Sequence, residues 1–368
     1  MSATEVGLTA AGGAVLLLVT VDVFATVLQH WSGAGFLTEW VSRGVWRTAR
    51  AATHRLPSSL RRRILGRVGP ALIPVTLAVW ALLVILGFAL LHLPWMPAEF
   101  GILPGVPPPR TLADALYYSG VVFFTLGLGD LVSLSPTLRF LTLIEAGSGF
   151  ALITLAISYF TSVYGAYSQQ QVWADSLFFQ SKGTADASVI IAAHLHGGAR
   201  LGVLATELAR LRDGVVRIRS DYASYPILHY FVSSRVEHSL LRLLFVLQDL
   251  VLLLDTAVDP RRSPDVAGLG GRSGLAMAVA HTCDSLFESI DRSRGSSAAS
   301  DAAELADMDS WRKHFAYALQ TLRGAGVPVD EGPEAVESYC RRRAEWEPVM
   351  RRSAALLGER WEDVTGDF

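Results

Sequence analysis

Three long apolar runs in the first 165 residues most strongly limit what this chain can fold into. In chain order, they are Gly7–Gln29, Ala71–Leu93 and Thr137–Tyr164. The second contains no charged residue, the first contains one, and the third contains two. A helix of about 20 apolar residues crosses the ~30 Å hydrocarbon core of a bilayer. Each run therefore predicts a transmembrane helix.

The composition agrees with a membrane protein and excludes several other classes. Charged residues make up 18% of the chain, against about 25% in ordinary soluble domains. The net charge of −2 gives no sign of the basic surface that binds nucleic acid. Two cysteines, Cys283 and Cys340, form neither a disulfide framework nor a zinc pattern. Familiar catalytic motifs are absent, so we predict that the chain is not an enzyme and has no cofactor or resident metal.

The loop between the first two runs sets the predicted orientation. It holds one acid, Glu39, and eight arginines: Arg43, Arg47, Arg50, Arg55, Arg61, Arg62, Arg63 and Arg67. Cytoplasmic loops carry such an excess of positive charge. We therefore expect a multi-pass protein of the cell membrane with its N-terminus outside and the region after the third span in the cytoplasm. Asp22 is expected to pair with a loop arginine or to reach the interface; a regulatory proton site is the alternative.

The stretch between the second and third runs suggests a pore. Leu112–Phe124 is apolar but too short to cross a bilayer, which predicts a re-entrant helix. Six residues follow it directly: Thr125, Leu126, Gly127, Leu128, Gly129 and Asp130. Alternating glycines adopt backbone conformations closed to other residues, and a strand of this kind can aim successive carbonyl oxygens in one direction. Rings of carbonyls can replace the hydration shell of a cation.

Residues 70–164 resemble the pore module of the potassium-channel superfamily, in its two-span, single-pore-loop, prokaryotic-like form. The family filter is typically Thr-Val-Gly-Tyr-Gly-Asp, and residues 125–130 occupy its positions. The family's pore-helix pattern, Ala-Leu-aromatic-aromatic-Ser, matches residues 115–119. The resemblance implies a homotetramer around a four-fold axis, because one pore loop cannot surround a pore, and it implies K⁺ as the permeating ion.

Three residues depart from the family pattern, and one of them is Val121, which stands where several relatives have a pore-helix carboxylate. Leu128 stands where the filter usually has tyrosine, and Phe124 replaces a threonine that usually precedes the filter. The prediction is a potassium-selective cation channel conducting through the Thr-Leu-Gly-Leu-Gly-Asp filter. Two alternatives stay open: a weakly selective cation channel, and a non-conducting, channel-like membrane sensor or scaffold that acts through its cytoplasmic part.

Two positions in the third run are candidates for roles near the filter. Glu145 is expected to pack behind the filter and hydrogen-bond to the pore helix, with direct ion contact as the alternative. Gly149 lies where the family often has a gating hinge. Two interpretations of this glycine are open. It lets the inner helix bend, or it lets the inner helix pack closely on the pore helix.

Charge and polarity return after Tyr167, in helix-length periodic segments. This part predicts an α-helical cytoplasmic bundle of about five helices. Ser239–Val258 is very apolar, but its charged residues favour a buried bundle helix over a fourth span. The fold class predicted for the chain is an all-α membrane protein, divided into residues 1–69, 70–165 and 166–368. Membrane lipids and an unidentified cytoplasmic ligand complete the expected partners.

Overall fold

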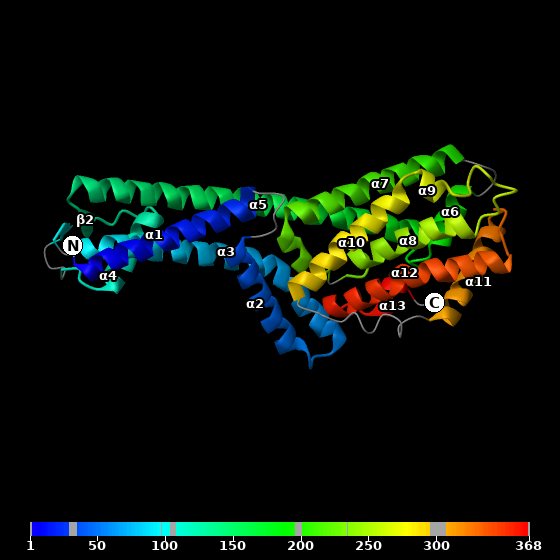
Figure 1. Ribbon diagram of the computed structural model, residues 1–368, viewed down its shortest axis with the longest axis horizontal. Helices are drawn as coiled ribbons and strands as arrows, with labels where there is room; N and C mark the ends of the chain where they lie inside the picture. The colour runs from blue at the N-terminus through cyan, green and yellow to red at the C-terminus, as the bar shows by residue number, and fades with distance from the viewer. Residues whose placement is uncertain are drawn as a thin grey trace. The chain divides into compact units, whose positions relative to one another are not determined.

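The computed structural model describes residues 2–28, 35–96, 98–103, 108–195, 201–233, 235–294 and 307–366. It is helical almost throughout, which confirms the predicted all-α class (Figure 1). The chain forms two compact units. The first unit, here the membrane unit, comprises Met1–Val45 and Pro70–Tyr164; the second unit comprises Trp46–Gly69 and Gly165–Phe368. Residues 46–69 thus pack in the second unit, whereas the sequence had grouped them with the first span.

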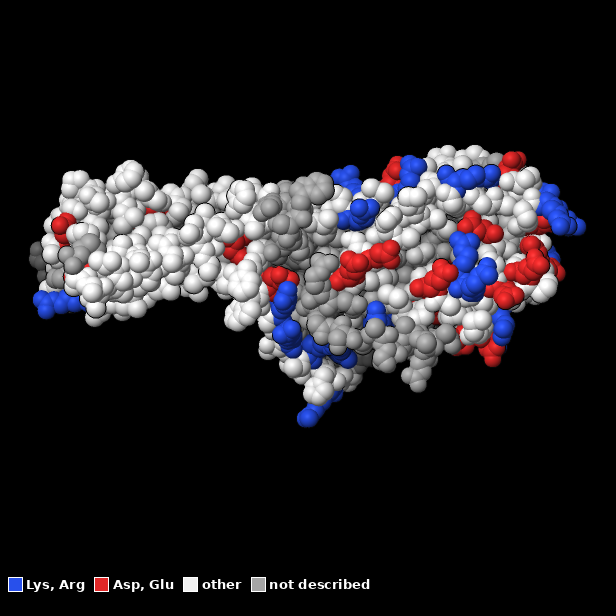
Figure 2. Space-filling view, viewed as in Figure 1, with Lys and Arg blue, Asp and Glu red and all other residues white. Residues whose placement is uncertain are grey.

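Three helices among the described residues are long and apolar enough to cross a membrane, as predicted. They are α1 (Ala3–Val23, continued by a π-helical turn over Phe24–Leu28), α3 (Ser58–His92) and α5 (Pro136–Gln180). Two of them are longer than their apolar runs: α3 begins well before the run, and α5 does not end at Tyr164. On the face shown in Figure 2, the membrane unit carries very few charged side chains.

Small residues let α1 and α3 approach closely in the membrane unit. A Cβ on Gly12 would lie 2.7 Å from the carbonyl oxygen of Gly87. Close backbone approach of this kind is a common way for helices to associate in lipid. A shared apolar cluster then joins four helices, with Val19 of α1, Trp80 and Phe88 of α3, Phe123 of the pore helix and Leu152 of α5.

Asp22 is buried at the end of α1 and caps the next helix, α2 (Phe36–Thr53). Its carboxylate accepts hydrogen bonds from the Leu37 amide at 2.7 Å, the Thr38 hydroxyl at 2.6 Å and the Trp80 indole at 2.8 Å. A carboxylate is favourable at a helix N-terminus, where unpaired amides carry partial positive charge. These hydrogen bonds replace the arginine pairing expected from the sequence.

The second unit contains eight helices after α5 in the part of the chain that the structure describes, more than the five expected. They are α6 (Ala187–Leu195), α7 (Leu201–Ser224), α8 (Leu240–Thr256), α9 (Leu269–Arg272), α10 (Leu275–Arg294), α11 (Met308–Gly324), α12 (Pro333–Leu357) and α13 (Trp361–Thr365). A 3₁₀ turn over Pro226–Tyr230 follows α7. Helix α8 is buried along nearly its whole length and contacts α6, α9, α10, α12 and α13, so it is the predicted bundle helix.

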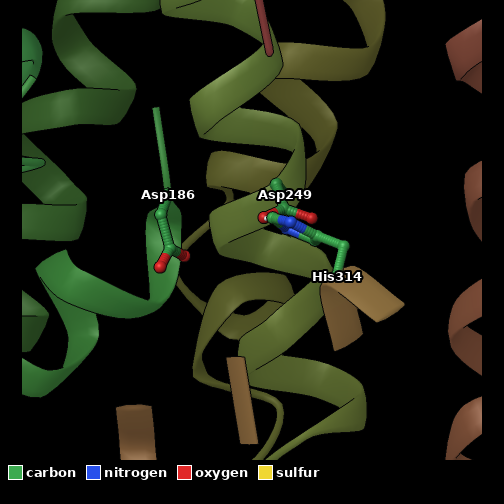
Figure 3. A group of neighbouring side chains, drawn as sticks. All are labelled: Asp186, Asp249 and His314. Carbon is green, nitrogen blue, oxygen red and sulfur yellow. The ribbon is translucent and has the colours of Figure 1, made fainter. Parts of the chain in front are cut away.

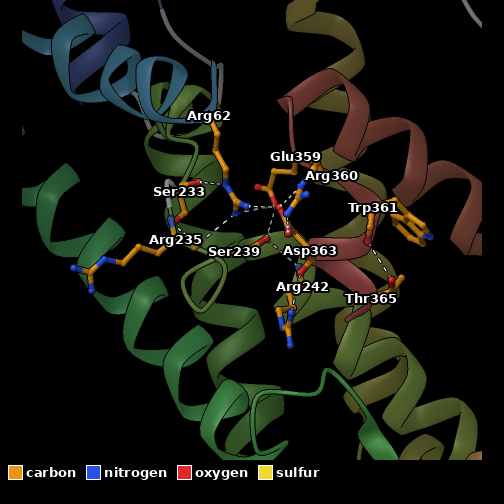
Figure 4. Close-up of polar contacts among 10 residues, drawn as sticks. All are labelled: Arg62, Ser233, Arg235, Ser239, Arg242, Glu359, Arg360, Trp361, Asp363 and Thr365. Atoms are coloured by element: carbon orange, nitrogen blue, oxygen red, sulfur yellow. Dashed lines mark hydrogen bonds and ion pairs between the residues drawn. The ribbon is translucent and has the colours of Figure 1, made fainter. Parts of the chain in front are cut away.

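A buried arginine joins the start of α3 to the rest of the second unit (Figure 4). Arg62 donates to the Ser233 carbonyl at 3.0 Å and pairs with the Asp363 carboxylate of α13 at 2.7 Å. Glu359 lies beside this pair and accepts a hydrogen bond from the Ser239 hydroxyl at 2.6 Å. Burial raises the pKa of Glu359, although the Ser239 hydroxyl and the Arg62 charge act in the opposite direction. Arg62 is therefore the buried cation beside both acids, and the more exposed Arg360 also pairs with Asp363 at 2.6 Å.

Replacing Arg62 with methionine should destabilise the second unit by about 3 kcal/mol, because removing one partner leaves buried charge uncompensated. The neighbouring Arg63 is exposed, so Arg63→Met, a matched control, should change stability by less than about 0.5 kcal/mol. Thermal denaturation of the full-length protein in detergent measures both. Equal melting temperatures for the two variants would contradict this role for Arg62.

Candidate functional site: the pore loop

The re-entrant helix predicted from the sequence is present as α4 (Leu112–Phe123). Thr111 and Asp114 form a capping box at its start: the Asp114 amide donates to the Thr111 hydroxyl at 3.2 Å, and the Thr111 amide donates to the Asp114 carboxylate at 2.9 Å. Reciprocal caps of this kind satisfy amides that the first helical turn leaves unpaired. Tyr118 and Phe123 are buried and fix the helix against the rest of the unit.

The backbone leaves α4 through a tight turn into the predicted filter segment. The amides of Thr125 and Leu126 donate to the Val122 and Val121 carbonyls at 2.9 and 2.8 Å. The next backbone angles are left-handed, with φ of +53° at Thr125, +59° at Gly127 and +78° at Gly129. Two of these three positions are the alternating glycines, and a Cβ on either would meet no atom within 4 Å. Their requirement for glycine is therefore conformational.

The far end of the filter segment is fixed by side-chain and strand contacts. The Tyr117 hydroxyl of α4 donates to the Asp130 carboxylate at 2.8 Å. Strand β2 (Leu131–Ser133) then pairs antiparallel with β1 (Phe100–Ile102). Between these anchored ends Leu126 and Leu128 are about three-fifths exposed in the single chain.

Glu145 of α5 is fully buried and contacts both other helices of the pore module. It hydrogen-bonds to the Ser119 hydroxyl of α4, which is the pore-helix contact predicted from the sequence. It also lies 3.0 Å from Nε2 of His92, the last residue of α3. His92 was not predicted as a site residue. Its only signal in the sequence is a polar side chain at the end of an uncharged apolar run.

Gly149 packs against the end of α4. A Cβ on Gly149 would collide with the carbonyl oxygen of Phe123, whereas a Cβ on Gly147 would meet nothing within 4 Å. Helix α5 is continuous through both positions. Close packing on the pore helix is thus sufficient to explain a glycine at position 149, and this geometry favours packing over the hinge.

One buried cluster in the second unit resembles a metal site in composition: Asp186, Asp249 and His314 (Figure 3). Its geometry is that of an ion-paired core instead. Asp249 is 2.9 Å from His314 Nε2 and accepts from the Tyr339 hydroxyl at 2.7 Å, and Arg343 lies 3.2 Å from it. A guanidinium so close to the acid would repel a dication. We therefore assign no metal to this cluster.

The Asp249 network makes the second unit sensitive to acid. Burial raises the pKa of Asp249, but His314, Arg343 and the Tyr339 hydroxyl outweigh burial, so its pKa lies below the usual range. A carboxyl with a lowered folded-state pKa contributes stability that is present above its unfolded pKa and lost as the pH falls through the folded one. The stability that the lowered pKa of Asp249 contributes is therefore present at neutral pH and is lost in acid.

Comparison with known proteins agrees with this geometry. Residues 75–166 match the family model described as ion channel. Over 255 residues the chain is 27% identical to an uncharacterized membrane protein, YdjJ, of Bacillus subtilis strain 168; the match covers 68% of this chain and 71% of the relative. No solved structure matches the chain. Residues 75–166 hold the second half of α3, all of α4, the predicted filter segment and the first part of α5, so this segment is an ion-channel pore module within a membrane protein.

Proposed function

We propose that the chain is a potassium-selective cation channel whose pore is a homotetramer, with Thr125–Asp130 as the filter. The observation that carries the proposal is the left-handed backbone at Gly127 and Gly129, directly after a re-entrant helix, in a segment that matches the ion-channel family. Four copies around one axis would bring four such backbones together. Their carbonyl oxygens would then replace the water around a dehydrated cation.

The surrounding residues support this role through electrostatics and restraint. Helix α4 ends at Phe123, directly before the filter, and the C-terminus of a helix carries about half a negative charge, which favours a cation there. The Tyr117–Asp130 hydrogen bond restrains the far end of the filter. It supplies part of the bracing that the missing filter tyrosine, replaced by Leu128, provides in the family.

Ion flux from the purified full-length protein in liposomes tests the proposal. Potassium flux should exceed sodium flux by at least roughly tenfold under matched gradients, because the carbonyl rings discriminate between the ions. Equal fluxes would replace this proposal with the weakly selective channel. Absence of flux of either ion from correctly folded protein would favour the membrane sensor or scaffold.

The proposed orientation places the start of α1 outside the cell and α2 inside. Ser2→Cys should react with an impermeant thiol reagent added to intact cells, and Ala52→Cys on α2 should react only after the membrane is opened, because the arginine-rich loop is retained in the cytoplasm. Both positions are exposed, and the two natural cysteines are buried and give little background. Labelling of position 52 in sealed cells would reverse the orientation.

A further inference from the structure

A chain of polar contacts runs through the apolar interior of the membrane unit and joins its three pore helices. His92 of α3 contacts Glu145 of α5 at 3.0 Å, Glu145 contacts Ser119 of α4, and the Ser119 hydroxyl lies 2.8 Å from the Ile85 carbonyl oxygen of α3. His92, Ser119 and Glu145 each have no exposed surface. Each hydrogen bond among these three side chains must therefore take its proton from one of the groups in the contact.

The contacts of Ser119 require two protons. Its hydroxyl oxygen is within hydrogen-bond distance of both the Ile85 carbonyl and the Glu145 carboxyl. A serine hydroxyl has one proton to donate, and a backbone carbonyl can only accept. The Ser119 proton therefore goes to Ile85, and the proton between Ser119 and Glu145 has to come from Glu145.

The surroundings of His92 lead to the same conclusion by a separate route. Its Nε2 faces Glu145, but its Nδ1 is buried without a hydrogen-bond partner among the described residues. The ring lies edge-to-face with Phe100 and Tyr118. A charged imidazolium would place a second N–H in this apolar contact with no acceptor, which is costly. A single N–H on Nε2, directed at Glu145, avoids this cost.

If His92 carries only this proton, no cation among the described residues pairs with Glu145 to balance an ionised carboxylate. An unpaired carboxylate in a buried, membrane-spanning segment is among the most expensive groups that a protein can hold. We propose that Glu145 is a neutral carboxylic acid, and that Ile85, Ser119, Glu145 and His92 form one uncharged hydrogen-bond relay. In this relay His92 donates to Glu145, Glu145 donates to Ser119, and Ser119 donates to the Ile85 carbonyl.

The role of the relay rests on the proposed channel function: it positions the pore helix without placing a fixed charge behind the filter. Ser119 lies on α4 shortly before the filter, and the relay links it to α3 and α5 together. His92 and Glu145 are thus positioning residues that hold α4 in register with its neighbours. Direct ion contact, the alternative for Glu145, is not needed to explain its contacts with Ser119 and His92.

Glu145→Gln and Glu145→Ala form the decisive pair of variants. Glutamine is neutral, its amide can donate to Ser119, and its carbonyl can accept from His92, so potassium selectivity should be retained. Alanine breaks both contacts, and selectivity over sodium should fall by roughly tenfold, because the filter is no longer held in one geometry. His92→Gln and His92→Leu test the other end in the same way, with the donor kept in the first and lost in the second.

Infrared difference spectroscopy at neutral pH tests the proton without requiring any flux. The spectrum of the wild-type protein minus that of Glu145→Gln should contain the carbonyl band of a protonated carboxyl and no carboxylate bands. Glu99→Gln alters an acid outside the relay. The spectrum of the wild type minus that of Glu99→Gln should therefore lack the protonated-carboxyl band, because Glu145 is unchanged in both proteins. Carboxylate bands in the difference spectrum, loss of selectivity in Glu145→Gln, or full selectivity in Glu145→Ala would each overturn the inference. Absence of flux in the wild type would count against the channel function alone, because the infrared result stands without it.

Discussion

Gly127→Ala is expected to abolish potassium flux while the protein still assembles. Gly127 has a φ of +59°, where an alanine costs roughly 1–2 kcal/mol, so a tetramer would incur about 4–8 kcal/mol at one level of the filter. That strain is sufficient to turn a carbonyl out of line. Because a Cβ at position 127 would contact nothing within 4 Å, packing and assembly should be unaffected.

Gly147→Ala is the matched control for this loss. Position 147 is helical, and a Cβ there would also meet nothing within 4 Å. Its flux should therefore equal that of the wild type. Liposome flux and size-exclusion chromatography on both variants provide the comparison, and unchanged potassium flux in Gly127→Ala would remove residues 125–130 as the filter.

Gly149→Ala is expected to weaken the membrane unit. The added methyl group would collide with the carbonyl oxygen of Phe123 at the end of α4, and overpacking of this kind costs about 1–3 kcal/mol per site. The melting temperature in detergent and the fraction of assembled protein should both fall, while Gly147→Ala leaves both unchanged. A normal melting temperature with a reduced open probability in single-channel recordings would instead identify Gly149 as a hinge.

The sequence was sufficient to predict the three spans, the re-entrant helix and the positive φ of Gly127 and Gly129. These features depend on residues that are contiguous in the chain: the length of an apolar run fixes a span, and a positive φ at Gly127 or Gly129 is a local backbone property. The contact between Glu145 and the pore helix was also predictable. An intramembrane acid needs a polar neighbour, and α4 lies directly before α5 among the helices of the chain.

Features set by contacts between distant residues could not be predicted in the same way. The partner of Asp22 is the start of α2 and not an arginine, because the fold brings unpaired amides to it. His92 meets Glu145 only once α3 and α5 are side by side in the membrane unit. Likewise, the sequence of residues 46–69 indicates only an arginine-rich loop, but Arg62 is buried against Asp363, which lies near the far end of the chain.

A density map of the purified full-length protein in potassium tests the proposed pore most directly. The expected result is four copies around one axis, with residues 125–129 of each copy facing it and a column of ion density between their carbonyl oxygens. An assembly without four-fold symmetry, or a map in which these residues lie away from the axis with no ion between them, would contradict the proposal that this chain conducts potassium through the Thr125–Asp130 filter.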